Sequence, residues 1–585
     1  MIKVLKNLDK KSYFLMIISF ILIALQVYLE LKMPDYMSKI TVLVQTEGSK
    51  MSQILNYGFK MLLCAFGSLI FSFIVVYLTA SISATFSLLT RKKIFNKVCE
   101  LDFHNVKDFS TSSLITRTTN DITQIEMLIS MGLMLMIKAP ITAIWAITKI
   151  INKSWQWSLV TLICVLVLLT TISIIMVIVI PRFKLIQKLT DKVNQVTREN
   201  LTGIRVIRAF NAESYQIKKF DKVNTLLTDT QMFNQKMFAI LSPVMFLIMY
   251  FLTLSIYYIG SNLIDVAIFS EKITLFGDMI VFSSYAMQII ISFLMLAIIF
   301  MFLPRANVSA KRINEVLETS SVIKDGTFDK ETDEKGLIEF KNVSFKYPDA
   351  EEYILKDISF TAKKGETVAI IGSTGSGKST LINLIPRFYD VTEGKVLIDN
   401  VNVKDYKLST LYNKIGYVSQ KAVLFSGSVL YNTEFGKSNN KKSKDDLIKA
   451  LDIAEATEFV TEMDKKYDSF ISQGGTNISG GQKQRLSIAR AIAKKPEIFI
   501  FDDSFSALDY KTDAKLRKKL KKEAADSTII IVAQRIGTII NSDKIIVLDK
   551  GKCVGIGKHK ELLKSCDIYK QIAESQLSKE ELDNA

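Results

Sequence analysis

Cysteine is scarce in this sequence of 585 residues, which contains five cysteines. They form no CxxC pair and no regular spacing, so neither a disulfide framework nor a cysteine metal site is supported. Two of them, Cys64 and Cys164, lie in apolar runs. No cleavable signal peptide is evident either, because the first apolar run is long and lacks a small-residue cleavage site. We therefore expect that run to remain in the protein as a helix.

Acidic residues are outnumbered, since 75 lysines and arginines against 58 aspartates and glutamates give a formal net charge of +17. Such an excess can indicate nucleic-acid binding. The mean hydropathy of +0.24 is high for a chain with 23% charged residues, however, and favours a membrane protein. Lysines and arginines near the cytoplasmic ends of membrane helices then explain the charge. We expect a membrane-lipid environment and no nucleic-acid partner.

Six apolar stretches are long enough to cross a bilayer as helices, which takes about 20 residues each. They lie near Tyr13–Leu31, Phe59–Ser81, Met127–Ile150, Trp157–Ile180, Phe238–Ile259 and Met279–Leu303. Basic residues gather in the N-terminal tail and after the second and fourth stretches, which places the N-terminus, these two segments and the C-terminal half in the cytoplasm. Helical periodicity at Ile115–Ile129 and Val193–Phe220 predicts that membrane helices continue into the cytoplasm.

Acids are few in these stretches. Asp35 and Asp265 lie near external ends, and no stretch shows an intramembrane ion relay. A lipophilic cargo that is cationic or amphipathic fits this composition.

The second half of the chain has another pattern, with short β-branched runs between helices and glycine turns. Examples are Leu337–Phe340, Thr367–Ile371, Ile498–Phe501, Thr528–Val532 and Lys544–Leu548. Strands that alternate with helices imply an α/β domain. We predict a multidomain chain with a cytoplasmic tail at 1–12, an all-α transmembrane domain of six helices at 13–305, a linker at 306–335, an α/β domain at 336–575 and a polar tail at 576–585.

A glycine-rich loop follows the predicted strand Thr367–Ile371 and opens a helical run at Thr380. It reads Gly372-Ser373-Thr374-Gly375-Ser376-Gly377-Lys378-Ser379 and fits the pattern GxxxxGK[ST]. The glycines let backbone N–H groups surround phosphates. Lys378 would reach the β and γ phosphates, and Ser379 would ligate Mg²⁺. The sequence thus predicts ATP and Mg²⁺ as ligands of a P-loop domain.

Two further segments belong with this loop. The strand Ile498–Phe501 ends in Asp502 and Asp503, and an acid at that place beside a P-loop holds Mg²⁺ or its water shell. Between the two motifs, a helix begins at a second potential phosphate site, formed by Ser479, Gly480, Gly481 and Gln482. One nucleotide does not need two such sites in one domain. The simplest explanation is a dimer in which this segment serves a nucleotide held by the partner.

The P-loop, the Ser479–Gln482 segment, Asp502-Asp503 and Ser506-Ala-Leu-Asp509 match the ATP-binding cassette (ABC) transporter family in order and spacing. Over nearly its whole length the chain resembles half-transporter exporters of this family. The resemblance implies ATPase-coupled export from the cytoplasmic side of the cell membrane, with drug, lipid and peptide cargo all open. It also implies that the stretches Asp102–Asn120 and Glu199–Phe210 couple the two domains.

The resemblance assigns roles to single residues. Tyr347 lies where the family stacks an aromatic ring on adenine, Gln420 where it senses Mg²⁺, and Asp509 where an acid crosses the dimer interface. The predicted metal ligands are Ser379, Gln420 and Asp502. The predicted nucleotide-binding residues are Tyr347, Gly372, Ser373, Thr374, Gly375, Ser376, Gly377, Lys378, Ser379, Thr380, Gln420, Ser479, Gly480, Gly481, Gln482 and Asp509.

Two residues depart from the family pattern in the hydrolytic machinery. Asp503 stands where the family has a glutamate that polarises the attacking water, and Gln534 where it has a histidine. The only histidines, His104 and His559, lie too far away to replace it. Glutamine can donate a hydrogen bond to a phosphate but cannot carry a proton or a positive charge. The pair could be tolerated drift.

The same pair resembles the degenerate-site subunit of heterodimeric multidrug exporters, which implies a second half-transporter as partner. The alternatives are a homodimeric exporter with slow ATPase and a nucleotide-gated regulator or channel.

Overall fold

The protein divides into two compact units in the computed structural model, which describes residues 2–46, 48–151, 153–436 and 442–577. Unit 1 comprises Met1–Leu101 and Val106–Ser320. Unit 2 comprises Asp102–Asn105 and Ser321–Ala585. The predicted polar tail at 576–585 lies outside the described residues from position 578 onward.

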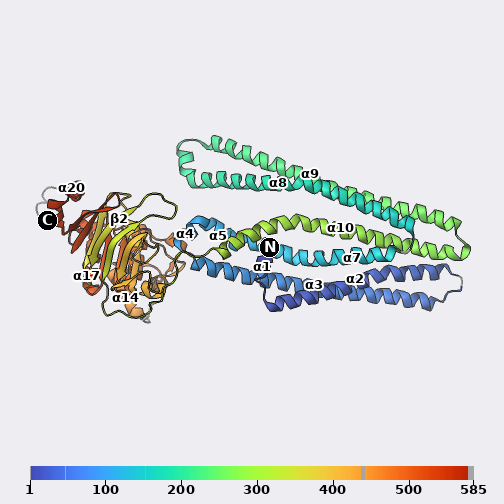
Figure 1. The fold of residues 1–585 in the computed structure, drawn as a ribbon, viewed down its shortest axis with the longest axis horizontal. Helices are drawn as coiled ribbons and strands as arrows, with labels where there is room; N and C mark the ends of the chain where they lie inside the picture. Colours follow the sequence, from blue (N-terminus) through green and yellow to red (C-terminus); the bar gives the residue numbers. More distant parts are fainter. Residues whose placement is uncertain (1, 47, 152, 437–441, 578–585) are drawn as a thin grey trace. The chain divides into compact units, whose positions relative to one another are not determined.

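Unit 1 is built from helices (Figure 1). They are α1 (Ile2–Leu5), α2 (Lys10–Gln45), α3 (Met51–Glu100), α4 (Phe103–Phe109), α5 (Thr111–Thr118), α6 (Asn120–Met127), a π-helical turn (Leu128–Gly132), α7 (Leu133–Ile150), α8 (Trp155–Ala209), α9 (Glu213–Val266) and α10 (Phe269–Glu318). Within the described ranges, six helical segments are long and apolar enough to cross a membrane: Lys10–Gln45, Met51–Glu100, Thr111–Ile150, Trp155–Ala209, Glu213–Val266 and Glu271–Ile299. The predicted six-helix domain is confirmed.

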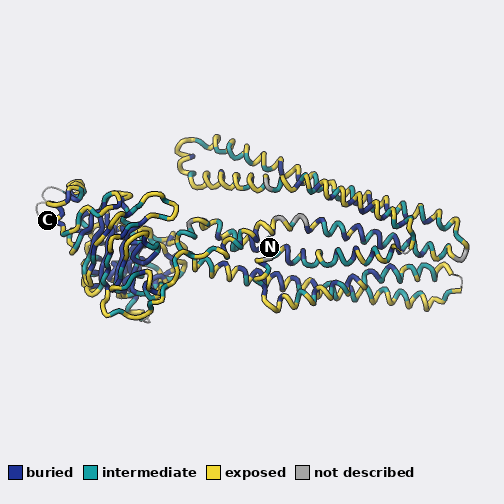
Figure 2. The backbone as a smooth tube through the Cα atoms, in the orientation of Figure 1, coloured by how far each residue is buried: buried dark blue, intermediate teal, exposed yellow. Residues whose placement is uncertain are grey.

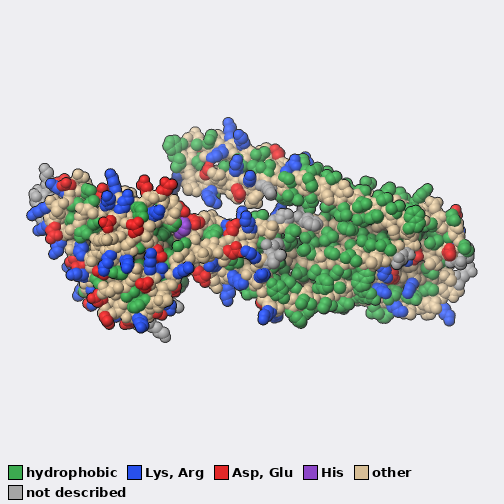
Figure 3. All heavy atoms as spheres, in the orientation of Figure 1, with side chains coloured by type: hydrophobic (Ala, Val, Ile, Leu, Met, Phe, Trp, Pro, Cys, Tyr) green, Lys and Arg blue, Asp and Glu red, His purple; other side chains and the backbone are tan. Residues whose placement is uncertain are grey.

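The core of unit 1 explains why these helices form. Helices satisfy every backbone N–H and C=O internally, which a lipid environment demands. Hydrophobic side chains cover much of the outer surface (Figure 3), while Val27, Phe86, Phe282 and Tyr285 are buried between the helices. The neighbours α8 and α9 run side by side, and their ends near residues 200–215 are largely exposed (Figures 1 and 2).

Several helix ends differ from the sequence-based boundaries. Helix α2 continues past Leu31 to Gln45, and α10 runs to Glu318, so residues 306–318 of the predicted linker are helical. The predicted helix Val193–Phe220 is interrupted, because α8 ends at Ala209 and α9 begins at Glu213. Hydropathy locates only the apolar part of a helix, and polar turns beyond it can keep their backbone hydrogen bonds in water.

The described part of unit 2 contains three sheets. A six-stranded sheet has the order β12-β11-β3-β10-β9-β6, a four-stranded sheet the order β2-β1-β4-β5, and β7 pairs with β8. The strands are β1 (Ile338–Phe345), β2 (Leu355–Ala362), β3 (Thr367–Gly372), β4 (Glu393–Ile398), β5 (Val401–Asn402), β6 (Ile415–Val418), β7 (Gly427–Ser428), β8 (Phe470–Ile471), β9 (Ile498–Asp502), β10 (Thr528–Val532), β11 (Lys544–Asp549) and β12 (Lys552–Gly557).

Helices of unit 2 alternate with these strands, which confirms the α/β prediction. They are α11 (Lys378–Asn383), α12 (Leu408–Lys414), α13 (Val429–Glu434), α14 (Lys444–Ile453), α15 (Thr457–Glu462), α16 (Gly480–Ala493), α17 (Tyr510–Glu523), α18 (Ile536–Ile539), α19 (His559–Ser565) and α20 (Asp567–Glu574). Strands β9 and β10 are buried at every residue, as expected for central parallel strands. Figure 2 shows this buried centre within unit 2.

The order of the parallel strands decides which loops become neighbours. Strand β10 lies between β3 and β9, and β9 pairs with β6, all in parallel. The carboxyl ends of these four strands therefore meet at one edge of the sheet. The segments that follow them carry the glycine-rich loop, Gln534, Asp503 and Gln420.

Candidate functional site

Four chain segments converge at the carboxyl edge of the six-stranded sheet, where ligands bind in open parallel α/β sheets. The loop from Ser373 to Gly377 follows β3, and Asp502 is the last residue of β9. Gln534 comes two residues after the end of β10, and Gln420 two residues after the end of β6. Ser504, which sequence reasoning missed, joins two of these ends by donating from Oγ to Val418 O at 3.0 Å.

The glycine-rich loop has the shape of a phosphate cradle. Gly375 and Gly377 have φ angles of +83° and +97°, which favour glycine. A Cβ on Gly377 would lie 2.8 Å from Leu355 Cδ2, so a larger residue would be crowded there. Ser376 Oγ is buried and, among the described residues, has no hydrogen-bond partner. A buried orphan of this kind suits a ligand oxygen, and the loop therefore fits ATP phosphates.

Lys378 begins α11 directly behind this loop. Its Nζ donates to Gly372 O and Ser373 O, both at 2.8 Å. Burial lowers the pKa of Lys378, and the charges of Asp503 and Asp502 oppose that shift. The amine is thus held at the loop, where it could reach the terminal phosphates of a nucleotide.

Ser379 and Asp502 form a pair that could hold Mg²⁺. Ser379 Oγ donates to Asp502 Oδ1 at 2.9 Å. Burial raises the pKa of Asp502, the hydrogen bond from Ser379 opposes this, and the charge of Asp503 raises the pKa further. A hydroxyl and a carboxylate are the oxygen ligands that Mg²⁺ prefers, so the residues fit the ion.

Asp503 is held by two amide side chains. Its Oδ2 accepts from Gln534 Nε2 at 2.8 Å and from Gln420 Nε2 at 3.2 Å. Its backbone lies in the left-handed region, with φ of +49°, and its C=O accepts from Ser506 Oγ at 2.8 Å. Burial raises the pKa of the Asp503 carboxyl. The structure thus brings the two residues that depart from the family pattern into direct contact.

Tyr347 lies beside the start of helix α11. Its Oη is 3.0 Å from Thr380 Oγ1, and its half-buried ring meets the rings of Phe345 and Tyr389 edge-on. This position is compatible with a flat ligand group near the phosphate loop.

The Ser479–Gln482 segment is organised within itself. Ser479 caps α16 by accepting from Gln482 N at 3.3 Å, and Gln482 Oε1 accepts from Ser479 N at 2.9 Å. Asp509 likewise caps α17 by accepting from Thr512 N at 2.9 Å. Ser479, Gly480 and Asp509 are exposed, and a Cβ on Gly480 would meet nothing within 4 Å. Among the described residues, the hydrogen bonds of these two caps are local, which leaves the surface of the Ser479–Gln482 segment accessible.

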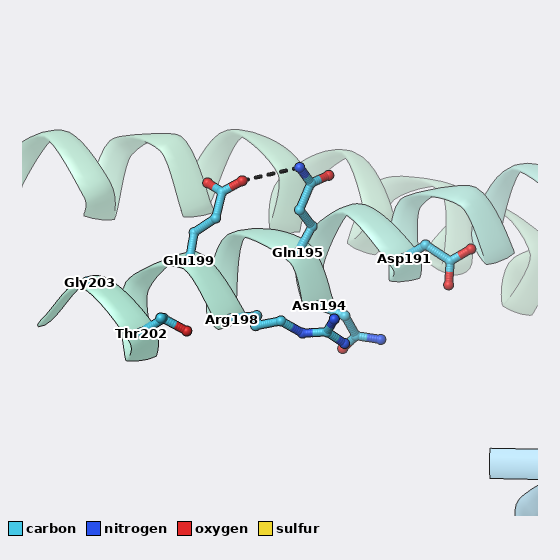
Figure 4. Close-up of a pocket in the computed structure, with 7 residues that line it drawn as sticks. All are labelled: Asp191, Asn194, Gln195, Arg198, Glu199, Thr202 and Gly203. Carbon is cyan, nitrogen blue, oxygen red and sulfur yellow. Dashed lines mark hydrogen bonds between the residues drawn. The ribbon is translucent and has the colours of Figure 1, made fainter. Parts of the chain in front are cut away.

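The stretch predicted to couple the domains, Glu199–Phe210, begins at a shallow pocket on α8. Figure 4 shows the pocket, which is lined by Asp191, Asn194, Gln195, Arg198, Glu199, Thr202 and Gly203. Glu199 accepts from Gln195 Nε2 at 3.1 Å and from Lys219 Nζ of α9 at 2.7 Å. The side chains of Leu201 and Phe210 are 72% and 78% exposed in this chain.

Family comparisons cover both units. The description "ABC transporter transmembrane region" matches residues 15–293, and "ABC transporter" matches residues 355–506. An uncharacterized ABC transporter ATP-binding protein of Mycobacterium tuberculosis is 38% identical over 517 residues, which are 88% of this chain and 86% of that protein. An ATP-dependent lipid A-core flippase of Pseudomonas aeruginosa is 31% identical over 82% of this chain and 78% of its own length.

A solved structure has the same fold. The structure of a bacterial Atm1-family ABC exporter with ATP bound superposes with a TM-score of 0.83 at 22% identity, and the match covers 98% of this chain and 100% of that one.

Proposed function

This chain belongs to the ABC transporter family and has the fold of an exporter half-transporter, and from that premise we propose that it is the degenerate-site subunit of a heterodimeric exporter. ATP binding and ATPase-coupled transport follow from the family in general. We further propose that this chain's own P-loop holds ATP and turns it over slowly. Its Ser479–Gln482 segment completes the hydrolytic site of a different half-transporter in the cell membrane.

The contact between Gln534 and Asp503 carries this proposal. An acid that polarises water must present a carboxylate oxygen to it. Here Oδ2 of Asp503 already accepts from two amides, at 2.8 and 3.2 Å. Aspartate is also one methylene shorter than glutamate, which withdraws the carboxylate by roughly 1 Å, and such a shift can cost on the order of 100-fold in rate. Lys378, Ser379 and Asp502, which we propose as the groups that hold ATP and Mg²⁺, support this because Lys378 Nζ lies at the glycine-rich loop and Ser379 bonds to Asp502.

The cargo we propose is lipophilic or amphipathic. The six apolar helices of unit 1 expose hydrophobic side chains over much of their surface (Figure 3). Relatives that are 30–31% identical include proteins described as ATP-dependent lipid A-core flippases, which supports a lipid-like substrate class.

The double substitution Asp503→Glu with Gln534→His tests the slow site. In the purified complex we expect it to raise ATP hydrolysis about tenfold or more, because the longer acid reaches the water and the imidazole can carry charge. Arg535→Lys, next to Gln534 in the chain, is the control that shows whether any substitution after strand β10 changes the rate of ATP hydrolysis. An unchanged rate would show that these two positions do not limit turnover.

Affinity purification of the tagged chain tests the partnership. We expect a second, different half-transporter to co-purify in equal amount. A pure homodimer with robust ATP hydrolysis would overturn the heterodimer proposal.

A further inference from the structure

Among the described residues, three acid–lysine pairs lie in or beside the apolar stretches of unit 1. Glu30 of α2 accepts from Lys138 of α7 at 2.8 Å, and Asp35 of α2 accepts from Lys149 of α7 at 2.8 Å. Asp278 of α10 pairs with Lys153. Ionisable residues inside membrane segments are rare and often mark substrate or ion pathways. The sequence predicted few acids in the apolar stretches and no ion relay, and it did not single out the Glu30–Lys138 pair.

The Glu30–Lys138 pair lies deep among the apolar segments. Lys138 lies near the middle of the apolar stretch Met127–Ile150, and its side chain is 15% exposed. Ser68, near the middle of the apolar stretch Phe59–Ser81, donates from Oγ to Glu30 Oε1 at 3.2 Å. Gly67 permits this approach, because a Cβ there would lie 2.7 Å from Leu29 Cδ1.

Hydrogen bonding around Glu30 is one-sided. Oε1 accepts from Gln26 Nε2 at 2.9 Å as well as from Ser68 and Lys138. No partner of Oε2 is found among the described residues, although the side chain is 26% exposed. Gln26 is only 2% exposed, and its Oε1 is buried without a partner in the same part of the chain. Two adjacent acceptors, the buried Gln26 Oε1 and the partly exposed Glu30 carboxylate at Oε2, thus have no donor within the part of the chain that the structure describes.

Asp35 shows that such a shortage is not general. Its Oδ1 accepts from Tyr285 Oη at 2.6 Å, and its Oδ2 accepts from Lys149 Nζ at 2.8 Å. Both carboxylate oxygens are therefore satisfied within unit 1. Asp35 therefore differs from Glu30, which lies on the same helix and has a partner on only one carboxylate oxygen among the described residues.

We propose that Glu30 and Gln26 form a binding site for a primary ammonium group on an amphiphilic substrate, with Lys138 as the internal cation that the substrate displaces. This inference rests on the proposed export function and narrows its cargo class. A primary ammonium has three N–H donors, like the Lys138 amine. One N–H can replace that amine at Glu30 Oε1, while the others reach Glu30 Oε2 and Gln26 Oε1. The four-carbon stem of Lys138 lets its amine withdraw.

Binding to the full-length transporter, purified with its co-purifying subunit in phosphatidylcholine nanodiscs without nucleotide, tests the site. The probe is radiolabelled dodecylammonium, with binding to empty nanodiscs subtracted. Dodecyltrimethylammonium, which has the charge but no N–H, and dodecanol, which has no charge, serve as competitors. Elution volume and thermal unfolding verify that each variant is folded.

Glu30→Gln is expected to lower the affinity for dodecylammonium about tenfold or more, as for the loss of one charged hydrogen bond. Asp35→Asn is the matched control, because both carboxylate oxygens of Asp35 already have hydrogen-bond donors. It is expected to change the affinity for dodecylammonium by less than about twofold from that of the unmodified transporter. Lys138→Gln should raise the affinity, because it removes the competing charge. Gln26→Leu should reduce the preference for dodecylammonium over its trimethyl analogue. Because this substitution changes no charge, it serves as the second test of the site if Glu30→Gln does not fold.

A lower affinity in Glu30→Gln together with a higher affinity in Lys138→Gln would distinguish a binding site from a purely structural ion pair. If both variants lower the affinity, or if Glu30→Gln behaves like Asp35→Asn, the proposal is wrong. Because binding is measured without ATP, a homodimer with fast hydrolysis would overturn the heterodimer proposal and leave these binding results intact.

Discussion

Asp503 shows how one residue can satisfy local backbone geometry while it alters chemistry. Its φ of +49° lies in a region where aspartate and asparagine are tolerated better than longer side chains. Its short side chain meets Gln534 and Gln420 at hydrogen-bond distance. A neutral amide cannot take the proton of an attacking water, so this contact orders the carboxylate without supplying a base.

The raised pKa of Asp502 predicts a pH dependence of Mg²⁺-dependent ATP binding. A carboxyl with a raised pKa takes up its proton sooner as the pH falls, and the protonated form is a poor Mg²⁺ ligand. As the pH is lowered, we therefore expect the Mg²⁺-dependent part of the ATP affinity to be lost at a higher pH than it would be if Asp502 had the pKa of an ordinary aspartate.

Asp503→Asn is the variant that checks this prediction. It removes the neighbouring charge that helps to raise the pKa of Asp502. The midpoint for binding of a fluorescent ATP analogue, titrated with and without Mg²⁺, should move to lower pH. A midpoint that stays in place or rises would contradict the assignment of Asp502 to the ion.

At the scale of the element, the phosphate loop depends on glycine for shape rather than for flexibility. Gly377 combines a φ of +97° with a Cβ position 2.8 Å from Leu355 of strand β2. Gly377→Ala is expected to lower the thermal unfolding temperature of unit 2, because an alanine in the left-handed region costs roughly 1 kcal/mol before any clash. ATP affinity should fall about tenfold as the loop amides shift.

Gly537→Ala is the control for this prediction. Its Cβ would meet Tyr510 Cε2 at an ordinary 3.8 Å, and its φ is not in the left-handed region. We expect an unfolding temperature close to that of the unmodified protein. Equal losses of ATP binding in both variants would show that the strain at Gly377 is not what shapes the loop.

The sequence predicted buried strands more accurately than exposed strands or the ends of helices, because only buried segments are continuous apolar runs. The predicted strand Thr528–Val532 coincides with β10, a buried run of β-branched residues. Strand β4 begins with three exposed residues, β12 has no buried residue, and neither strand was singled out from the sequence. The end of α2 was placed at Leu31, because the charged residues Lys32 and Asp35 interrupt the apolar run there, although the helix continues to Gln45.

At the scale of the whole molecule, the two phosphate-binding segments predict an asymmetric response to mutation. In the proposed heterodimer, Lys378 acts in the slow site and Ser479 in the partner's hydrolytic site. Ser479→Arg should therefore abolish most ATP hydrolysis of the complex, with a loss of about tenfold or more. Lys378→Met should mainly lower ATP retention and reduce hydrolysis less.

Steady-state hydrolysis and filter binding of labelled ATP on the same preparations would measure both effects. Ser479→Ala is the milder control, because the loss of the helix cap costs only about 1 kcal/mol of stability. Equal losses of hydrolysis for Ser479→Arg and Lys378→Met would favour two equivalent sites and hence a homodimer.

The sequence by itself determined the six apolar helices, the α/β class of the second half, the P-loop and the strand ending in Asp502. Each of these features depends on residues that are contiguous in the sequence, and each is recognised by their periodicity, their hydropathy or their spacing. Only the tertiary structure decided that Gln420 and Gln534 meet on one oxygen of Asp503, and that Glu30 meets Lys138 across 108 residues of chain. Such contacts follow from the order of the parallel strands and the packing of the helices, which no local pattern encodes.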